Sequence, residues 1–271
     1  SAFEGCSSLK RIVIPEGVRS IREKTFCECT ALQEIRLPDG LELIGRSAFS
    51  ECEALQEIRL PDGLKEIGSD AFSGCRSLRQ ITVPVGVKCI ETAVFQSCRA
   101  LQEVHLPEGL EQIGMFAFED CDTLTRIVLP ASLKRLCRGA FENCTSLLEA
   151  QLPDGLEELQ DDAFEYCRSL QKVTIPAQVR QIERAAFYYC QSLQEVQLPE
   201  ELNEIGEDAF AHCWALKRIV IPAGVEKVGE HAFWECYSLQ NIAVLSDDTE
   251  IAEDAFEDCP GTVKRGTGSL F

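Results

Sequence analysis

One stretch of the sequence decides the fold: Ala48-Phe49-Ser50-Glu51-Cys52-Glu53-Ala54-Leu55-Gln56-Glu57-Ile58-Arg59-Leu60-Pro61-Asp62-Gly63-Leu64-Lys65-Glu66-Ile67-Gly68. Edited copies of it fill almost the whole chain of 271 residues. Its phenylalanine returns every 23 residues from Phe3 to Phe256, and its cysteine keeps the same step from Cys6 to Cys259. Phe3 and Phe256 are 253 residues apart, or 11 periods of 23, so the span carries no net insertion. Self-similarity at such a period is typical of a solenoid.

Each copy contains a short strand that a proline ends. Apolar residues alternate with polar ones in Ile58-Arg59-Leu60, which is typical of a half-buried strand. Pro61 follows and lacks the amide donor that a strand ladder needs. A turn such as Asp62-Gly63 comes next, and we expect its glycine at positive φ. A further extended piece ends at Ile67, and we expect it to pair as a second, less regular ladder.

The segment around Ala48-Phe49, between the extended piece of one copy and the strand of the next, is too short for a full helix. We therefore expect a helical turn or a 3₁₀ segment there. A single turn has no core of its own and buries its apolar residues only against equivalent residues of neighbouring turns. The sequence therefore predicts a β-rich solenoid, a right-handed superhelix of about 11 repeats of 23 residues. It would carry a parallel sheet on one face, with short helical or 3₁₀ turns and irregular extended segments on the other.

Charge and hydropathy limit the partners of this chain. A net charge of -19 and a pI near 4.6 make the surface repel phosphate groups, so we expect neither nucleic acid nor anionic lipid to bind. No apolar run approaches the roughly 20 residues of a membrane helix. We therefore expect no membrane insertion of this segment.

Both ends depart from the pattern. The chain begins at Ser1-Ala2-Phe3, in the middle of a copy, which predicts a fragment of something longer. After Leu239 the motif decays, and Phe256 then restores the register. We expect a single solenoid domain over 1–259, truncated within a repeat at its start and ending in a degenerate capping repeat over 240–259. Residues 260–271 are predicted to be a loose tail or the start of a following domain.

Three elements recur together in fixed register: Leu-x-x-Ile-x-Leu-Pro, Val-x-x-Ile-Gly and Ala-Phe-x-x-Cys. In these motifs the chain, from Ser1 to about Cys259, resembles the BspA-like (Treponema-type) leucine-rich repeat family of bacterial surface proteins. The resemblance implies a solenoid of the α/β leucine-rich repeat class and an extracellular, cell-surface location. It also implies binding of a protein partner, such as host matrix or another cell's surface protein, and no catalytic residues.

The 15 cysteines are interpreted as packing residues. Twelve form the ladder, where side chains about 5 Å apart would point the same way and act as small hydrophobes. Cys27, Cys89 and Cys137 lie off the ladder, and we expect them to be exposed. No metal site is expected, because Cys27-Glu28-Cys29 lacks the two-residue gap of a zinc knuckle.

The sequence offers no catalytic constellation. His105, His212 and His231 are the only histidines, and none belongs to a His-Glu-x-x-His pattern. No Gly-x-Ser-x-Gly elbow occurs either. We expect no enzymatic activity and no cofactor.

The aromatic residues other than phenylalanine gather in about a quarter of the chain. All of them lie within two positions of a ladder cysteine, where other copies have residues such as Glu51 and Arg76. We predict one exposed ridge over four successive turns, with His212 beside it, and interpret it as the binding site because Tyr and Trp are enriched in hot spots. Repeat drift or the packing of a neighbouring domain would also explain it. The candidate binding residues are Tyr166, Tyr188, Tyr189, His212, Trp214, Trp234 and Tyr237.

The outward side chains of the strands form a second candidate surface, since solenoids commonly bind on such a sheet. Their columns mix both charge signs, which cross-strand pairing also explains. The leading hypothesis is a cell-surface protein-binding module, which we expect to be a monomer. Two alternatives stay open: a passive stalk that presents another domain, and glycan binding through stacking on the aromatic residues.

Overall fold

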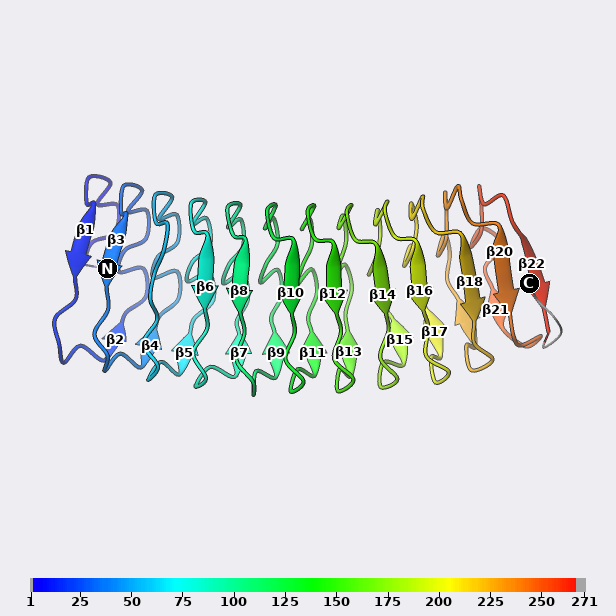
Figure 1. Ribbon diagram of the computed structural model, residues 1–271, viewed down its shortest axis with the longest axis horizontal. Coiled ribbons are helices and arrows are strands. Elements are labelled where there is room, and N and C mark those ends of the chain that lie inside the picture. Colours follow the sequence, from blue (N-terminus) through cyan, green and yellow to red (C-terminus); the bar gives the residue numbers. More distant parts are fainter. Residues whose placement is uncertain (1, 267–271) are drawn as a thin grey trace.

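The 23-residue period becomes a stack of turns in which equivalent residues of neighbouring copies lie side by side. The computed structural model describes residues 2–266 and shows a long, gently curved rod with two ladders of short strands along it (Figure 1). All strand pairs of the described residues are parallel, as Ile12 with Ile35 and Ile81 with Val104 illustrate. The parallel solenoid of about 11 turns predicted from the sequence is confirmed.

The first ladder contains the longer strands (the longer arrows in Figure 1). In a strand such as Gln80–Thr82 the middle residue is buried and its two neighbours face solvent, as the alternation predicts. The strands are β1 (Arg11–Val13), β3 (Glu34–Arg36), β6 (Gln80–Thr82), β8 (Glu103–His105), β10 (Arg126–Val128), β12 (Glu149–Gln151), β14 (Lys172–Thr174), β16 (Glu195–Gln197), β18 (Arg218–Ile221), β20 (Asn241–Val244) and β22 (Thr262–Arg265).

Hydrogen bonding along this first ladder is interrupted. It divides into four sheets, in the orders β1-β3, β6-β8, β10-β12-β14-β16 and β18-β20-β22. Residues 57–59, which the pattern predicts as a strand, form none. The buried side chains of Ile58 and Leu60 still pack into the continuous core there. Apolar stacking, more than strand pairing, therefore keeps this face together.

The second ladder is built from two-residue strands, and the prediction of a second ladder is confirmed. Its sheets have the orders β2-β4-β5, β7-β9-β11-β13 and β15-β17-β19-β21. The strands are β2 (Ser20–Ile21), β4 (Leu43–Ile44), β5 (Glu66–Ile67), β7 (Cys89–Ile90), β9 (Gln112–Ile113), β11 (Arg135–Leu136), β13 (Glu158–Leu159), β15 (Gln181–Ile182), β17 (Glu204–Ile205), β19 (Lys227–Val228) and β21 (Glu250–Ile251).

We call the segment around each Ala-Phe pair, such as residues 45–54, the Phe–Cys turn. None of these turns is helical within residues 2–266, so the prediction of helical or 3₁₀ segments is wrong there. Over residues 47–52, amide groups donate alternately to the carbonyl three residues earlier and to the next repeat, as Phe49 N does to Ala71 O at 2.8 Å. Positive φ at Ser47 (50°) and Glu51 (56°) reverses the chain direction every fourth residue. A helix cannot continue through such positions, because it needs negative φ throughout.

The glycines follow a different rule from the predicted one. Gly17 and Gly109 have positive φ (91° and 95°), but Gly63 does not, so the expected turn geometry holds only in some repeats. Close approach explains the glycine that ends the second ladder. A Cβ on Gly68 would lie 2.7 Å from the backbone nitrogen of Arg46, and no side-chain movement relieves a clash with backbone.

The core is a column of phenylalanine rings beside a column of thiols. The ten rings from Phe26 to Phe233 are completely buried. Neighbouring rings stack with centroids between 5.0 Å (Phe233 with Phe256) and 5.7 Å (Phe72 with Phe95) apart. Each ladder thiol from Cys29 to Cys259 donates to a phenylalanine carbonyl of the preceding repeat, as Cys144 Sγ does to Phe118 O at 3.2 Å. This repeating pair of contacts is why both residues recur without exception.

The C-terminal part continues the first ladder further than the sequence suggested. Strand β22 pairs with β20, from Asn241 with Thr262 to Val244 with Arg265, so these residues are not a loose tail. The Arg265 guanidinium donates to the carbonyls of Asp247 (2.9 Å) and Thr249 (3.2 Å), which holds the strand against the preceding loop. Residues 267–271 of the predicted tail lie outside the described residues. The domain limits at 259 and 260 stay a prediction.

Candidate functional site

The tyrosine and tryptophan side chains come together on the outer side of four successive Phe–Cys turns. Ring centroids lie 5.2 Å apart for Tyr166 and Tyr189, 6.0 Å for Tyr189 and Trp214, and 6.4 Å for Trp214 and Tyr237. Tyr188 joins them at 5.0 Å from Tyr189. The 23-residue period alone brings these residues together, since they are far apart in the sequence. We call the group the aromatic surface: Tyr166, Tyr188, Tyr189, Trp214, Trp234 and Tyr237.

The aromatic surface is only partly exposed, which corrects the prediction of one uniformly exposed ridge. Tyr237 is 54% exposed and Trp214 is 37% exposed, whereas Tyr166, Tyr188, Tyr189 and Trp234 are half-buried. The reason is mutual cover, because each half-buried ring packs against a ring of the same or the next turn. The accessible part is therefore at Trp214 and Tyr237.

His212 was predicted to lie beside the ridge, but it lies beneath it. Its side chain is buried (4% exposed), with ring centroids 4.1 Å from Tyr189 and 4.7 Å from Trp234. Larger rings on the neighbouring turns cover it. Its Nδ1 lies 2.9 Å from Glu235 Oε2 but is not aligned for a hydrogen bond. His212 supports the rings above it and does not offer a contact surface itself.

Several aromatic residues occupy a left-handed backbone position. Tyr166, Tyr189 and His212 have φ of 56°, 58° and 59°. The equivalent position is left-handed in other repeats too, with residues as different as Gly74 and Glu51. The amide at this position donates to a carbonyl of the next turn in each case, so the stack imposes the conformation whatever the side chain.

Three contributors to this site were missed at the level of sequence. The Arg168 guanidinium lies over the Tyr166 ring, 5.6 Å from its centroid, and the His231 ring lies 5.3 Å from that of Trp234. Glu235 lies between His212 and Tyr237. Arg168 could have been found from the period, because it occupies the same position after the ladder cysteine as Trp214 and Tyr237.

The phenol groups of Tyr188 and Tyr237 stay protonated at neutral pH. Burial, with the neighbouring Tyr166 and Tyr189, raises the pKa of Tyr188 to about 12. A hydrogen bond to the Glu235 carboxylate raises the pKa of Tyr237 to about 12. The surface therefore presents neutral rings with hydroxyl donors beside carboxylates.

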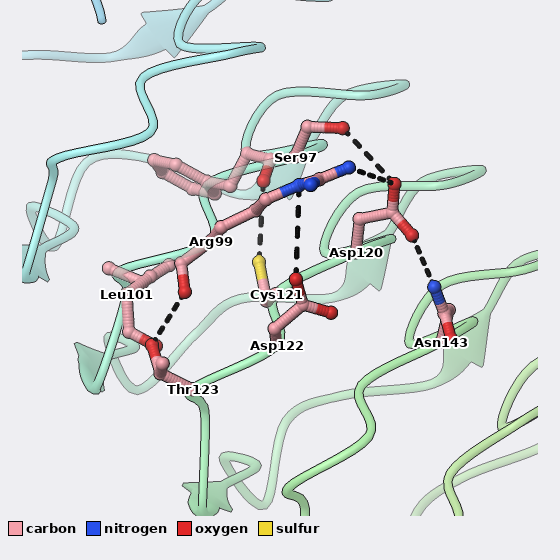
Figure 2. A network of polar contacts seen from close by, with 9 residues as sticks. Ser97, Arg99, Leu101, Asp120, Cys121, Asp122, Thr123 and Asn143 are labelled. Atoms are coloured by element: carbon pink, nitrogen blue, oxygen red, sulfur yellow. Dashed lines mark hydrogen bonds and ion pairs between the residues drawn. The ribbon is translucent and has the colours of Figure 1, made fainter.

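The same outer positions carry a polar network in the middle of the solenoid (Figure 2). Asp120 accepts hydrogen bonds from Ser97 Oγ (3.3 Å) and Asn143 Nδ2 (2.6 Å) on the two neighbouring turns. Arg99 approaches the carboxylates of Asp120 and Asp122 at 3.9 and 3.8 Å. These polar side chains form hydrogen bonds and ion pairs with one another along the stack. On the aromatic surface, by contrast, Trp214 and Tyr237 stay exposed to solvent.

The outward side chains of the first ladder form ion pairs between neighbouring strands. Arg11 with Glu34 (3.5 Å), Arg126 with Glu149 (3.0 Å) and Lys172 with Glu195 (3.3 Å) all join adjacent repeats. The interrupted part of the ladder at residues 57–60 lines a surface hollow of about 550 Å³. Cross-strand pairing thus explains the charges on this face without a ligand, as the sequence allowed.

The cysteines support the packing interpretation, with a correction for those off the ladder. All 15 are free. Cys27 and Cys137 are buried (8% and 9% exposed) and Cys89 is half-buried, so the prediction that these three are exposed is wrong. Burial raises the pKa of ladder thiols such as Cys121 and Cys144 well above the ordinary value, which keeps them unreactive. Within residues 2–266, no group of three or more His, Cys, Asp or Glu could hold a metal ion.

These features define a class of protein. The solenoid keeps one buried pattern in every turn and leaves the outer positions free to vary, which is the construction of a leucine-rich repeat scaffold for protein interaction. In the described part of the chain, no helix is long and apolar enough to cross a membrane.

Comparison with protein families identifies the group to which the chain belongs. The model of the BspA type leucine-rich repeat region matches residues 1–98, 65–192 and 157–264 and comprises six copies. The chain is a member of this family of repeat scaffolds, as its motifs predicted, and leucine-rich repeat proteins of this kind are non-catalytic. Comparison with curated proteins gives no match.

Solved structures of bacterial leucine-rich repeat proteins resemble this one. A protein from Bacteroides ovatus is 32% identical with a TM-score of 0.79, and the match covers 97% of this chain and 74% of that one. A leucine-rich cell surface protein from Faecalibacterium prausnitzii is 26% identical with a TM-score of 0.57, covering 97% and 80%. The pneumococcal vaccine antigen PcpA shares the fold at 20% identity, with a TM-score of 0.61 and coverage of 96% and 69%.

Proposed function

We propose that this chain is a cell-surface module that binds a protein partner through the aromatic surface. The observation that carries the proposal is the exposure of Trp214 and Tyr237 at one end of a row of contiguous rings. Tyr and Trp are the residues most enriched in binding hot spots, and exposed apolar patches on soluble proteins usually have a purpose. Partners of the expected kind are host matrix proteins or the surface proteins of another cell.

The proposed location rests on relatives. The Faecalibacterium prausnitzii protein, 26% identical, is described as a cell surface protein, and its match covers 97% of this chain. A surface location places the aromatic residues where partners on other cells or in the matrix can reach them.

The test is adherence of the double variant Trp214→Ala/Tyr237→Ala to matrix-coated wells and to host-cell layers. We expect adherence to fall about tenfold or more, because hot-spot aromatics dominate binding energy. The melting temperature should stay the same, since both side chains are exposed. The matched control is Val13→Ala/Val128→Ala, which removes two side chains that are 66% and 64% exposed on the sheet face. Equal adherence of wild type and both variants would instead indicate a passive stalk.

Glycan binding is the second candidate, favoured by the geometry of the two most exposed rings. Trp214 and Tyr237 are inclined by only 32° to each other, so their faces could stack on successive sugar rings. A glycan array separates the two proposals. Binding to defined glycans that Trp214→Ala/Tyr237→Ala abolishes would replace a protein partner with a carbohydrate one.

A further inference from the structure

The last three Phe–Cys turns of the described chain have an unusual charge distribution. Residues 206–215, 229–238 and 252–261 include eight Asp and Glu and no Lys or Arg. The corresponding turns near the N-terminus, over 22–31, 45–54 and 68–77, include Arg22, Lys24, Arg46 and Arg76. The exposed part of the aromatic surface therefore lies on turns that contain no lysine or arginine. The eight acidic residues are Glu207, Asp208, Glu230, Glu235, Glu253, Asp254, Glu257 and Asp258.

Two of these carboxylates adjoin the exposed Tyr237 ring. The Tyr237 amide donates to the Glu235 carbonyl at 2.9 Å, which places the two residues in one tight turn. The carboxylates of Glu235 and Asp258 both raise the pKa of the Tyr237 hydroxyl. Glu235 and Asp258 are equivalent residues of neighbouring repeats, each directly before the ladder cysteine. Asp258 is exposed to solvent, whereas the Glu235 side chain is 24% exposed and faces His212 Nδ1 at 2.9 Å. The two carboxylates give the edge of the exposed rings a negative charge.

The protein itself shows how such a ring accepts a cation. At the other end of the aromatic surface, the Arg168 guanidinium lies over Tyr166 at 5.6 Å from the ring centroid. Arg168 comes directly after its ladder cysteine, and the residues at this position two and three repeats later are Trp214 and Tyr237. In the described part of the chain, no arginine or lysine lies over either of these two rings. Within the described residues, the exposed rings of Trp214 and Tyr237 thus have no arginine of the kind that Arg168 provides for Tyr166.

We propose that Trp214, Tyr237, Glu235 and Asp258 bind an arginine-bearing segment of the partner protein. The proposal rests on the proposed function, for which it names the chemistry of the partner. A guanidinium would stack on an exposed ring and donate hydrogen bonds to a carboxylate at its edge. Stacking and planar donors favour arginine over lysine, whose ammonium is more strongly hydrated. These turns contain no lysine or arginine of their own that would compete for the exposed rings.

The experiment uses the full chain and a fluorescent peptide with several arginines, in buffer of physiological salt. The matched probe replaces each arginine with citrulline, which keeps the shape and removes the charge. We expect the citrulline peptide to bind about tenfold more weakly or worse. A similar loss is expected for the arginine peptide with Trp214→Ala/Tyr237→Ala, a variant that leaves the net charge unchanged. Equal binding by wild type and this variant would overturn the proposal, because it would show attraction by the overall charge of -19 alone.

A second pair of variants tests the carboxylates. Glu235→Gln/Asp258→Asn should weaken binding of the arginine peptide about threefold to tenfold. The control Glu108→Gln/Asp154→Asn removes the same charge from exposed residues elsewhere, and we expect little change. Equal losses in the two pairs would count against the site. If Trp214→Ala/Tyr237→Ala abolishes adherence but no arginine peptide binds, the proposed function stands and this inference fails.

Discussion

The turns over residues 45–54 and 206–215 have the same inner side and different outer sides. Inside, both have glycine, alanine, phenylalanine and cysteine at equivalent positions, and the phenylalanine and cysteine of both are completely buried. Outside, Glu51 and Glu53 of the first turn correspond to His212 and Trp214 of the second. The backbone hydrogen bonds of the two turns are equivalent. The inner residues therefore carry the fold, and the outer residues can change without altering it.

The inner and outer sides of the turns should differ most in how much stability is lost when an aromatic ring is removed from each. Phe141 stacks between Phe118 and Phe164, with centroids 5.3 and 5.4 Å away, and is completely buried. We expect Phe141→Ala to lower the free energy of unfolding by about 3 to 5 kcal/mol, measured by chemical denaturation. Phe116, half-buried on the outer side of a neighbouring turn, is the matched control. Phe116→Ala should cost about 1 kcal/mol or less, and equal losses would contradict the division into two sides.

Asp162 tests an exception, since it is an outer residue that is buried. Its side chain is 3% exposed and forms ion pairs with Arg138 at 2.9 Å and Arg184 at 3.1 Å. We expect Asp162→Ala to cost about 1 to 3 kcal/mol in thermal or chemical unfolding, because it removes charge-assisted hydrogen bonds that link three repeats. Glu157→Ala breaks an exposed pair with Lys134 and should cost less than about 0.5 kcal/mol. Similar small losses for both would place Asp162 with the ordinary outer residues.

The smallest effect concerns two half-buried carboxyl groups on the outer side. Burial, together with nearby Glu119 and Asp162, raises the pKa of Glu142 to about 7. Burial, together with Asp162 and Glu142, raises the pKa of Glu165 to about 7. Because the folded values exceed the ordinary value of 4.5, their stabilising contribution is complete below about pH 4.5 and is lost as pH rises through about 7. Since both groups are partly exposed, we expect this loss to be about 1 kcal/mol or less.

The measurement is the melting temperature at several values between about pH 5 and pH 8. Glu142→Gln/Glu165→Gln should flatten the decline relative to wild type. The overall negative charge also contributes to such a decline, so Glu108→Gln/Asp154→Asn serves as a control with the same change in net charge. If the control flattens the curve equally, the local arrangement of Glu142 and Glu165 has no special effect.

Much of the fold could be read from spacing because equivalent residues must stack. The positions of Phe49 and Ile58 in their copies specify a ring column and a strand ladder without reference to any other part of the chain. The non-helical Phe–Cys turn could not be predicted in the same way. Its left-handed residues, such as Ser47 and Tyr189, share no side-chain type, because hydrogen bonds to the next turn impose the conformation.

The sequence predicts which residues come together at the site, but not how deeply each side chain is buried. The period correctly groups Tyr166 with Trp214 and Tyr237, since it depends only on register. Burial of His212 depends on the size of the side chains on the turns before and after it, and so does the cover of Cys27 and Cys137. Burial by the side chains of neighbouring turns cannot be predicted from the pattern of a single repeat.

The sequence by itself determined the period, the inner residues, the parallel register and the family, because all four follow from which residues recur every 23 positions. Only the tertiary structure decided how deeply each outer side chain lies, where strand pairing is interrupted, and which outer side chains contact one another. These properties arise between neighbouring turns, whose outer residues differ. In a solenoid, repetition specifies what is buried, and the particular neighbours decide what is left exposed.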